Sequence, residues 1–110
     1  MDISVTQHQK NLRTLPCIVT EMTPVTLHHC HGGSMKLRGW HVGVAQKQNP
    51  WLQIPLHESL HTGSHGIDSG MGVETWEKRF GSQWGYLEEV RELLGYDIFR
   101  MAQMFEGLKA

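Results

Sequence analysis

The sequence predicts an α+β fold made of one domain. Short segments before residue 57 alternate apolar and polar residues as strands do, and segments after residue 73 carry apolar residues at helical spacing. The length of 110 residues is that of one domain, and at such a length about 60–70% of the unfolded surface is buried. With 39% hydrophobic residues and twelve glycines, the core should be modest, so a bound metal could add to its stability.

The first part of the chain is expected to contribute an arm and two strands. Residues 1–14 are polar and without period, which predicts a flexible N-terminal arm before a single domain over residues 15–110. Leu15–Val19 is short and apolar and reads as an edge strand. Met22–His29 alternates apolar and polar side chains and is also expected to form a strand.

The middle of the chain is expected to be a loop, a strand and a short helix. Met35–Asn49 has little period and predicts a long functional loop, with a short strand near Trp40–Val44. Trp51–Pro55 follows a turn signal and reads as a second strand. Leu56–His61 has helical spacing and should end at Gly63 after about two turns.

The remainder, over residues 73–108, is expected to be helical and to supply much of the core. Val73–Phe80 carries apolar residues on one face. Ser82 can cap the next helix, which should stop at Gly95, and Asp97 can cap the last one. The aromatic and methionine residues of these helices are interpreted as core rather than as a cofactor site.

Histidine is concentrated in one tract, and this concentration suggests a metal site. Of eight histidines, seven lie between His28 and His65. Neutral imidazole is the commonest protein ligand for transition metals and also a general base near neutral pH. His57 and His61 are four residues apart, so on a helix they share a face and can hold one ion. His28, at the end of the incoming strand, is the natural third ligand.

The remaining histidines of the tract are expected to play other parts. Neighbouring residues on a strand point to opposite faces, so His28 and His29 cannot easily bind the same ion. His29 is therefore predicted to be the general base that activates water near the metal. Cys30 is interpreted as a small buried side chain. His31, His41 and His65 are interpreted as loop residues, with His65 as the substitute ligand if His57 points away from the metal.

The charge distribution favours nucleic acid as a partner. The net charge is −1, but the first 57 residues hold two acidic and five basic residues, and the remainder nine acidic and five basic. No acidic residue lies between Met22 and Leu56, whereas Lys36, Arg38 and Lys47 do. These three cations are predicted to contact a DNA backbone, with affinity that falls as salt rises and with little sequence preference.

The compartment expected from the sequence is the cytoplasm, without a membrane association. No run of about 18 apolar residues is present. The first ten residues lack the apolar stretch of a secretory signal. Cys17 and Cys30 are expected to be free thiols in a reducing compartment.

Three blocks of the chain resemble a known family of nucleases. LHHCHGGSM, IPLHESLH and FGSQWGYL, spread over roughly Pro24 to Leu87, are similar to blocks of the HNH or ββα-metal endonucleases. The likeness is greatest to phage-encoded Ref-type recombination-enhancement nucleases. It implies a small ββα-metal core over about residues 24–65, with two or three additional C-terminal helices over residues 73–108.

The resemblance also implies a role for individual residues. His28 matches the first metal ligand of the motif, His29 the base and His61 the last ligand. His57 stands where the phage relatives have a cysteine. Asn49 is the candidate for the middle asparagine, which orients the base by a hydrogen bond. One divalent ion is implied, Mg²⁺, Mn²⁺ or Zn²⁺.

The function that these expectations favour is metal-dependent hydrolysis of DNA phosphodiester bonds by water, leaving 5′-phosphate and 3′-hydroxyl ends. The resemblance further implies a phage or prophage origin, a link to recombination, and a recombinase filament as an additional partner.

Two alternatives remain open from the sequence. His57-Glu58-Ser59-Leu60-His61 matches the HExxH pattern of zinc metalloproteases, with Glu58 as base. The extended form of that pattern is absent, and Gly63 should end the helix too early for a protease of this class. The other alternative is a catalytically inactive, metal-stabilised module that binds DNA or protein.

Overall fold

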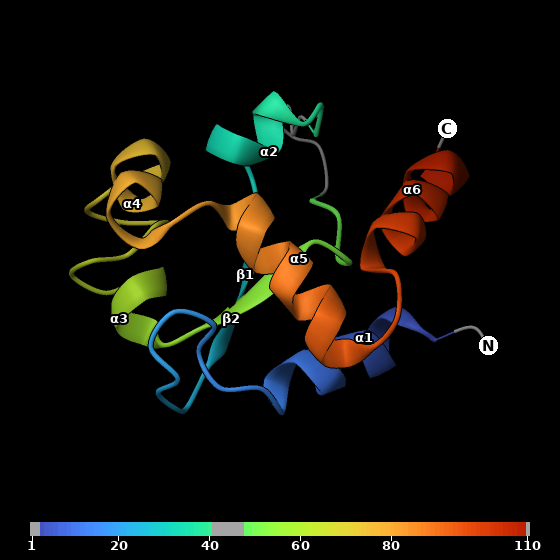
Figure 1. The fold of residues 1–110 in the computed structure, drawn as a ribbon, viewed down its shortest axis with the longest axis horizontal. Helices are drawn as coiled ribbons and strands as arrows, with labels where there is room; N and C mark the ends of the chain where they lie inside the picture. The colour runs from blue at the N-terminus through green and yellow to red at the C-terminus, as the bar shows by residue number, and fades with distance from the viewer. Residues whose placement is uncertain (1–2, 41–47, 110) are drawn as a thin grey trace.

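The structure, a computed structural model, describes residues 3–40 and 48–109, and within them six helices surround a two-stranded antiparallel sheet (Figure 1). The predicted α+β class is confirmed. In chain order the elements are α1 (Val5–Arg13), β1 (Thr26–His29), α2 (Gly33–Leu37), β2 (Gln53–Leu56), α3 (Glu58–His61), α4 (Val73–Phe80), α5 (Gln83–Leu94) and α6 (Ile98–Lys109).

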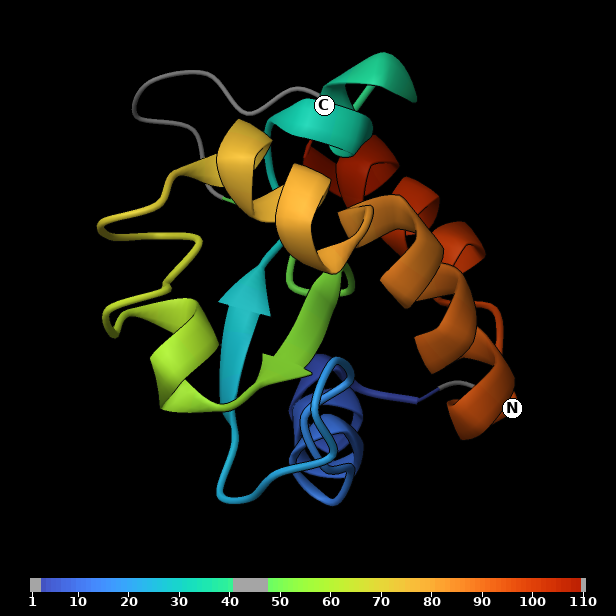
Figure 2. The same cartoon turned by 60° about the vertical axis from the view of Figure 1, so that its left-hand side comes forward.

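The sheet lies at the centre and determines which histidine faces inward. Thr26 pairs with Leu56 and His29 with Gln53, so His28 lies opposite Ile54. Because side chains alternate along a strand, His28 points to one face and His29 to the other. Helices α1 and α3 pack on both strands and α5 packs on β2 (Figure 2). His28 is consequently fully buried.

The core joins the sheet to the C-terminal helices. Trp76 of α4 is fully buried, and its indole Nε1 donates to the Leu60 carbonyl at 3.1 Å, which ties α4 to α3. Burying an aromatic side chain together with its polar atom requires such a partner. The other large core residues are Leu12, Met35, Ile54, Leu56, Ile67, Leu87 and Ile98.

The predicted C-terminal helices are confirmed, together with their caps. Helix α4 has the predicted bounds. The Ser82 hydroxyl accepts from the Gly85 amide at 3.2 Å and begins α5, which ends where Gly95 adopts a left-handed conformation with φ 80°. Asp97 accepts from the Phe99 amide at 3.1 Å at the start of α6.

The predicted N-terminal arm is wrong for the described residues 3–14, because most of them form α1. The Ser4 hydroxyl caps this helix by accepting from the Gln7 amide at 3.1 Å. His8 and Leu12 are fully buried and lie one turn apart, so they form an inward stripe. Most of the other residues of the helix are polar, which hides the helical period in the sequence.

The strand expected at Leu15–Val19 is also wrong. This segment forms a tight turn, in which the Cys17 amide donates to the Met22 carbonyl at 3.0 Å and the Glu21 amide donates to the Cys17 carbonyl at 2.8 Å. The strand expected over Met22–His29 forms only at its end, as β1.

Between residues 35 and 61 the elements of the structure begin and end at other residues than expected. The loop expected over Met35–Asn49 begins within α2, and the strand expected near Trp40–Val44 falls almost entirely outside the described residues. The strand expected at Trp51–Pro55 forms two residues later at its start, as Gln53–Leu56, and takes over the first residue of the expected helix.

Cys17 and Cys30 are both free thiols, as predicted, and both are buried. No helix in the part of the chain that the structure describes is long and apolar enough to cross a membrane.

His8 connects α1 to the rest of the core as a neutral side chain. Its ring stacks on Trp51 at 4.7 Å between centroids, and its Nδ1 lies 2.7 Å from the Tyr96 hydroxyl. Burial lowers the pKa of His8 from 6.5 to about 4, against a smaller opposing contribution from the backbone of Trp51. Between these two pH values the unfolded chain binds a proton that the folded chain does not.

We therefore predict that His8 makes the fold less stable as pH falls from 6.5 towards 4. A lowered pKa of this size corresponds to a loss of about 3 kcal/mol across that window. Urea unfolding at several pH values measures it, with His8→Gln as the comparison. The wild type should lose more stability on acidification than the variant. Equal pH dependence in both proteins would contradict this prediction.

Candidate metal centre

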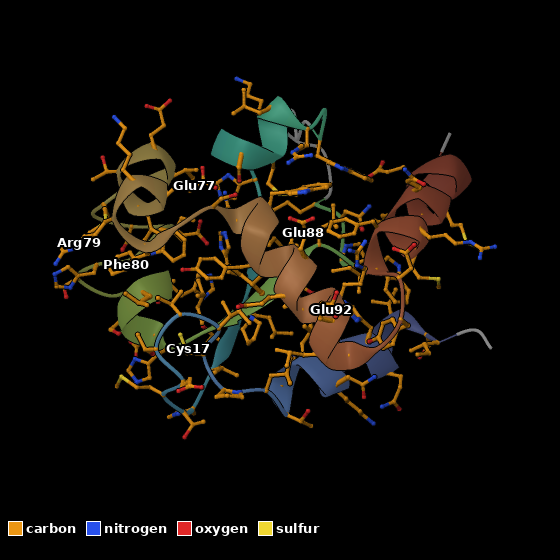
Figure 3. The ribbon with its side chains drawn as sticks, viewed as in Figure 1. Cys17, Glu77, Arg79, Phe80, Glu88 and Glu92 are labelled. Carbon is orange, nitrogen blue, oxygen red and sulfur yellow. The ribbon has the colours of Figure 1, made fainter. Side chains whose placement is uncertain are left out.

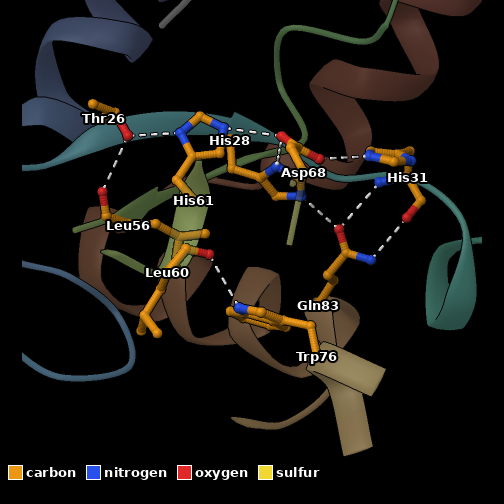
Figure 4. Close-up of polar contacts among 9 residues, drawn as sticks. All are labelled: Thr26, His28, His31, Leu56, Leu60, His61, Asp68, Trp76 and Gln83. Carbon is orange, nitrogen blue, oxygen red and sulfur yellow. Dashed lines mark hydrogen bonds and ion pairs between the residues drawn. The ribbon is translucent and has the colours of Figure 1, made fainter. Parts of the chain in front are cut away.

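One carboxylate, that of Asp68, faces three histidine rings (Figure 4). Its Oδ2 lies 2.8 Å from His28 Nδ1 and 3.0 Å from His61 Nε2. Its Oδ1 lies 3.0 Å from His31 Nε2. The three rings come from β1, from the residues that follow it, and from the last residue of α3.

The loop after α3 carries Asp68 back to His61 by local contacts. The Asp68 amide donates to the His61 carbonyl at 3.0 Å, and the Ile67 amide donates to the Leu60 carbonyl at 3.0 Å. Ile67 is buried, so it anchors the loop in the core. At Gly66 a Cβ atom would lie 2.5 Å from the His61 carbonyl oxygen, and therefore only glycine allows this close approach.

The proton position on His28 follows from its second partner, Gln83. Gln83 Oε1 accepts from the His31 amide at 3.1 Å, and Gln83 Nε2 donates to the His31 carbonyl at 2.8 Å. These two backbone contacts fix which end of the side-chain amide is oxygen. His28 Nε2, which lies 2.8 Å from that oxygen, must therefore carry a hydrogen. In the neutral ring, Nδ1 then presents a lone pair to Asp68.

His61 is held in the opposite tautomer by Thr26. The Thr26 hydroxyl donates to the Leu56 carbonyl at 3.2 Å, so its oxygen accepts from His61 Nδ1 at 2.7 Å. The lone pair of the neutral ring is then on Nε2, which faces Asp68. One nitrogen of each ring and one carboxylate oxygen thus converge, and their mutual repulsion requires either extra protons or a cation.

The convergent atoms have the chemistry of a metal site. His28, His61 and Asp68 each offer one ligand atom, and these atoms lie within 4.8 Å of one another. Ligating histidines usually donate their other ring hydrogen to an oxygen, as both rings do here. The partners are the Gln83 amide oxygen for His28 and the Thr26 hydroxyl for His61.

The pKa values of Asp68, His31 and His29 are shifted from their ordinary values. Burial disfavours ionised Asp68. When the facing ring nitrogens carry the extra protons, hydrogen bonds from His28, His31 and His61 outweigh burial and hold the pKa of that carboxyl well below its usual range. The hydrogen bond to Asp68 raises the pKa of His31, although burial opposes it. Burial, together with repulsion from His28, lowers the pKa of His29.

His57, predicted to be a ligand, lies outside this cluster. Its backbone is extended, with φ −61° and ψ 146°, and it caps α3 instead of belonging to it. Its Nδ1 accepts from the Ser59 amide at 3.3 Å and lies 2.9 Å from the Ser59 hydroxyl. The expected helical face shared by His57 and His61 is therefore not formed, and Asp68, not His57, lies beside His28 and His61.

Asn49, predicted to orient the base, holds the last helix instead. Its Nδ2 donates to the Ala102 carbonyl at 3.0 Å and to the Glu106 carboxylate at 3.1 Å. Its Oδ1 accepts from the Trp51 amide at 3.0 Å. Both hydrogens of the side-chain amide are thus used in attaching α6, which gives Asn49 a structural role.

Of the three residues predicted to contact DNA, the structure describes two, Lys36 and Arg38. Lys36 is exposed on α2. The Arg38 guanidinium lies 5.1 Å from the centroid of the Trp84 ring, and so it stacks on α5. Lys47 lies outside the described residues.

Three residues of the site were missed by sequence reasoning. Asp68 lies in a turn with no motif around it, and His31 had been interpreted as a loop residue. Gln83 lies within the FGSQWGYL block, which carried the family resemblance, but no role was attached to it. Its position as the first residue of a helix whose cap is Ser82 was the available signal.

Comparison with models of known protein families, with curated proteins and with solved structures finds no match for this chain.

The cluster predicts that Asp68, not His57, governs metal affinity. We expect Asp68→Ala to weaken Zn²⁺ binding by more than about 100-fold, because even the loss of a supporting group outside the ligand shell costs 10–100-fold. His57→Ala should keep the affinity of the wild type, because it removes only a helix cap. Isothermal titration calorimetry measures both.

The wild type should also melt at a higher temperature with Zn²⁺ than without it, since an ion that binds only the folded state stabilises it. If His57→Ala lost as much affinity as Asp68→Ala, the helical pair His57 and His61 would be the true site.

Proposed function

We propose that this chain is a metal-dependent endonuclease that hydrolyses DNA phosphodiester bonds. The observation that carries the proposal is the convergence of His28 Nδ1, His61 Nε2 and Asp68 Oδ2, with the hydrogens of both rings engaged elsewhere. A cation bound there would stabilise negative charge on the phosphate and on the leaving oxygen.

The donor set favours a borderline-soft ion. Two imidazoles suit Zn²⁺ and other transition metals better than Mg²⁺, which prefers oxygen ligands. The N···O separations of 2.8 and 3.0 Å are close to the spacing of about 3.0–3.4 Å between neighbouring ligands whose bonds to zinc are about 2.1 Å long. Zn²⁺ and Mn²⁺ therefore suit this set of ligand atoms, which lie within 4.8 Å of one another.

The surrounding elements support a ββα-metal core. Strands β1 and β2 and helix α3 contact one another, and each strand or helix contributes a residue to the site or to its support. This order of two strands and a helix is that of the HNH resemblance stated above. We therefore propose the HNH class for this core. A phage origin and a recombinase filament as partner stay predictions.

His29 is proposed as the general base that takes a proton from the attacking water. It lies next to His28 on β1, with its side chain on the other face, and it is near enough to the cluster to be influenced by the charges of His28, His31, His61 and Asp68. Burial keeps its pKa below 6.5, so the ring is neutral at pH 7, as a base must be.

Phosphate contacts are proposed for the basic residues beside α2. Lys36 and Lys78 line a cavity of about 520 Å³ between α2 and α4, which Glu74 and Glu77 also line. Arg38 follows the last residue of α2, and its guanidinium stacks on Trp84 of α5. Such cations hold a nucleic-acid backbone through charge, with little dependence on sequence.

A second candidate is a metal-stabilised binding module without catalysis. The specific observation in its favour is the structural role of Asn49, which leaves the proposed base His29 without the asparagine partner that the HNH motif provides. This candidate predicts the same metal site and the same DNA contacts, but no strand cleavage.

The protease alternative receives no support from the site. Its HExxH pattern needs both histidines on one helical face, whereas His57 caps a helix of only four residues and Glu58 is exposed on its first turn.

We predict that purified protein with Zn²⁺ or Mn²⁺ nicks supercoiled plasmid DNA, and that a chelator abolishes nicking. His29→Ala should reduce the rate by about 10²–10⁴-fold, as expected for the loss of a general base, while calorimetry still detects the bound metal. Gel electrophoresis of the plasmid measures the rate.

Glu58→Gln is the matched control, since it alters an exposed side chain next to the site and should leave nicking unchanged. If the wild type binds metal and DNA but never cuts the DNA, the nuclease proposal is wrong and the binding module is favoured. Loss of peptide cleavage in Glu58→Gln would favour the protease.

A further inference from the structure

Gln83 is the buried centre of a contact network that continues from the metal cluster into helices α4 and α5. Its side chain is fully buried. Oε1 accepts from His28 Nε2 at 2.8 Å and from the His31 amide at 3.1 Å. Nε2 donates to the His31 carbonyl at 2.8 Å and lies 3.3 Å from Glu77 Oε2. Every polar atom of this side chain therefore has a partner.

Glu77 holds Gln83 in place from the other side. Its Oε2 accepts from the Gln83 amide at 2.8 Å and from the Ser34 hydroxyl, and its Oε1 accepts from the Ser34 amide at 2.9 Å. In Figure 3 Glu77 lies between α4, which carries it, and the ends of α2 and α5. These ends are helix N-termini, whose free amides favour an anion.

Gly33 allows the Glu77 carboxylate to reach the end of α2. A Cβ atom at this position would lie 2.0 Å from Glu77 Oε1, and the backbone has φ 44°, which side chains other than glycine rarely adopt. The Gly32-Gly33-Ser34 turn, which follows His31 in the sequence, thus binds the same carboxylate that anchors Gln83.

We propose that Gln83, anchored by Glu77, is a positioning residue that sets the proton of His28 on Nε2 and so directs the Nδ1 lone pair to the metal. The geometry supports this because the two contacts with the His31 backbone prevent the amide from turning over. An amide in the reverse orientation would present hydrogens to His28 and favour the tautomer that cannot bind the ion through Nδ1.

The effect on metal affinity rests on the metal site of the proposed function, whereas the effect on the tautomer of His28 does not. Loss of a group that orients a ligating histidine typically weakens metal binding by about 10–100-fold. We expect a loss in that range for Gln83→Leu, which replaces the amide with an apolar side chain of roughly similar size and provides no acceptor.

The test uses the full chain labelled with ¹⁵N, with Zn²⁺ as the probe. Long-range ¹H–¹⁵N spectra of the imidazole rings identify which nitrogen of each histidine carries hydrogen. The Zn²⁺-bound wild type should have His28 protonated on Nε2 and His61 protonated on Nδ1. Calorimetry with Zn²⁺ then compares the wild type with Gln83→Leu.

Ser82→Ala is the matched control. It removes the cap of α5 next to Gln83 and so loosens the same helix end, but it leaves the contact with His28. We expect it to lower Tm without changing the tautomer of His28 or the Zn²⁺ affinity. A merely structural role for Gln83 would instead make Ser82→Ala and Gln83→Leu weaken Zn²⁺ binding alike, which would overturn the proposal.

The spectrum of the wild type can overturn the inference even if Gln83→Leu does not fold. A hydrogen on Nδ1 of His28, or no binding of Zn²⁺, overturns the inference. Zn²⁺ binding with His28 protonated on Nε2, weakened in Gln83→Leu, supports it even if no variant cuts DNA, in which case only the nuclease function fails.

Discussion

The arrangement of the site depends on one electrostatic constraint, the convergence of three imidazole rings on the carboxylate of Asp68. Two of the ring hydrogens are committed elsewhere, to Gln83 from His28 and to Thr26 from His61. The atoms left facing the carboxylate are electron-rich, and at about 3 Å in a partly buried site their repulsion is large unless positive charge lies between or on them. A divalent ion satisfies this requirement without additional protons.

The C-terminal helices do more than cover the sheet, because they hold the parts of the site against one another. Trp76 of α4 binds the Leu60 carbonyl one residue before His61, and Glu77 on the same helix anchors Gln83. Gln83 in turn holds His28 and the backbone of His31. Segments far apart in the sequence are thus linked through one small set of buried hydrogen bonds, which rigidify the donor geometry.

The sequence predicted what is determined locally and missed what depends on tertiary contacts. Helices α4 and α5 were predicted correctly because caps such as Ser82 and apolar spacing are local signals. Helix α1 was missed because only two of its residues, His8 and Leu12, are buried, and one of these is polar.

Within the site, HxxxH spacing was taken for a helix, but β2 extends to Leu56 and leaves His57 with a strand-like backbone. Asp68 was missed because only the folding of the loop at Gly66 brings it to the histidines. Strand alternation predicted that His28 and His29 point to opposite faces, and the structure shows that His28 is the buried one.

The most direct test of this account is a crystal structure of the protein with Zn²⁺, with anomalous scattering recorded at the zinc absorption edge. The account predicts one anomalous peak about 2.0–2.2 Å from each of His28 Nδ1, His61 Nε2 and an Asp68 oxygen. A peak bound to His57 in place of Asp68, or no peak at this cluster with Zn²⁺ in excess, would contradict it.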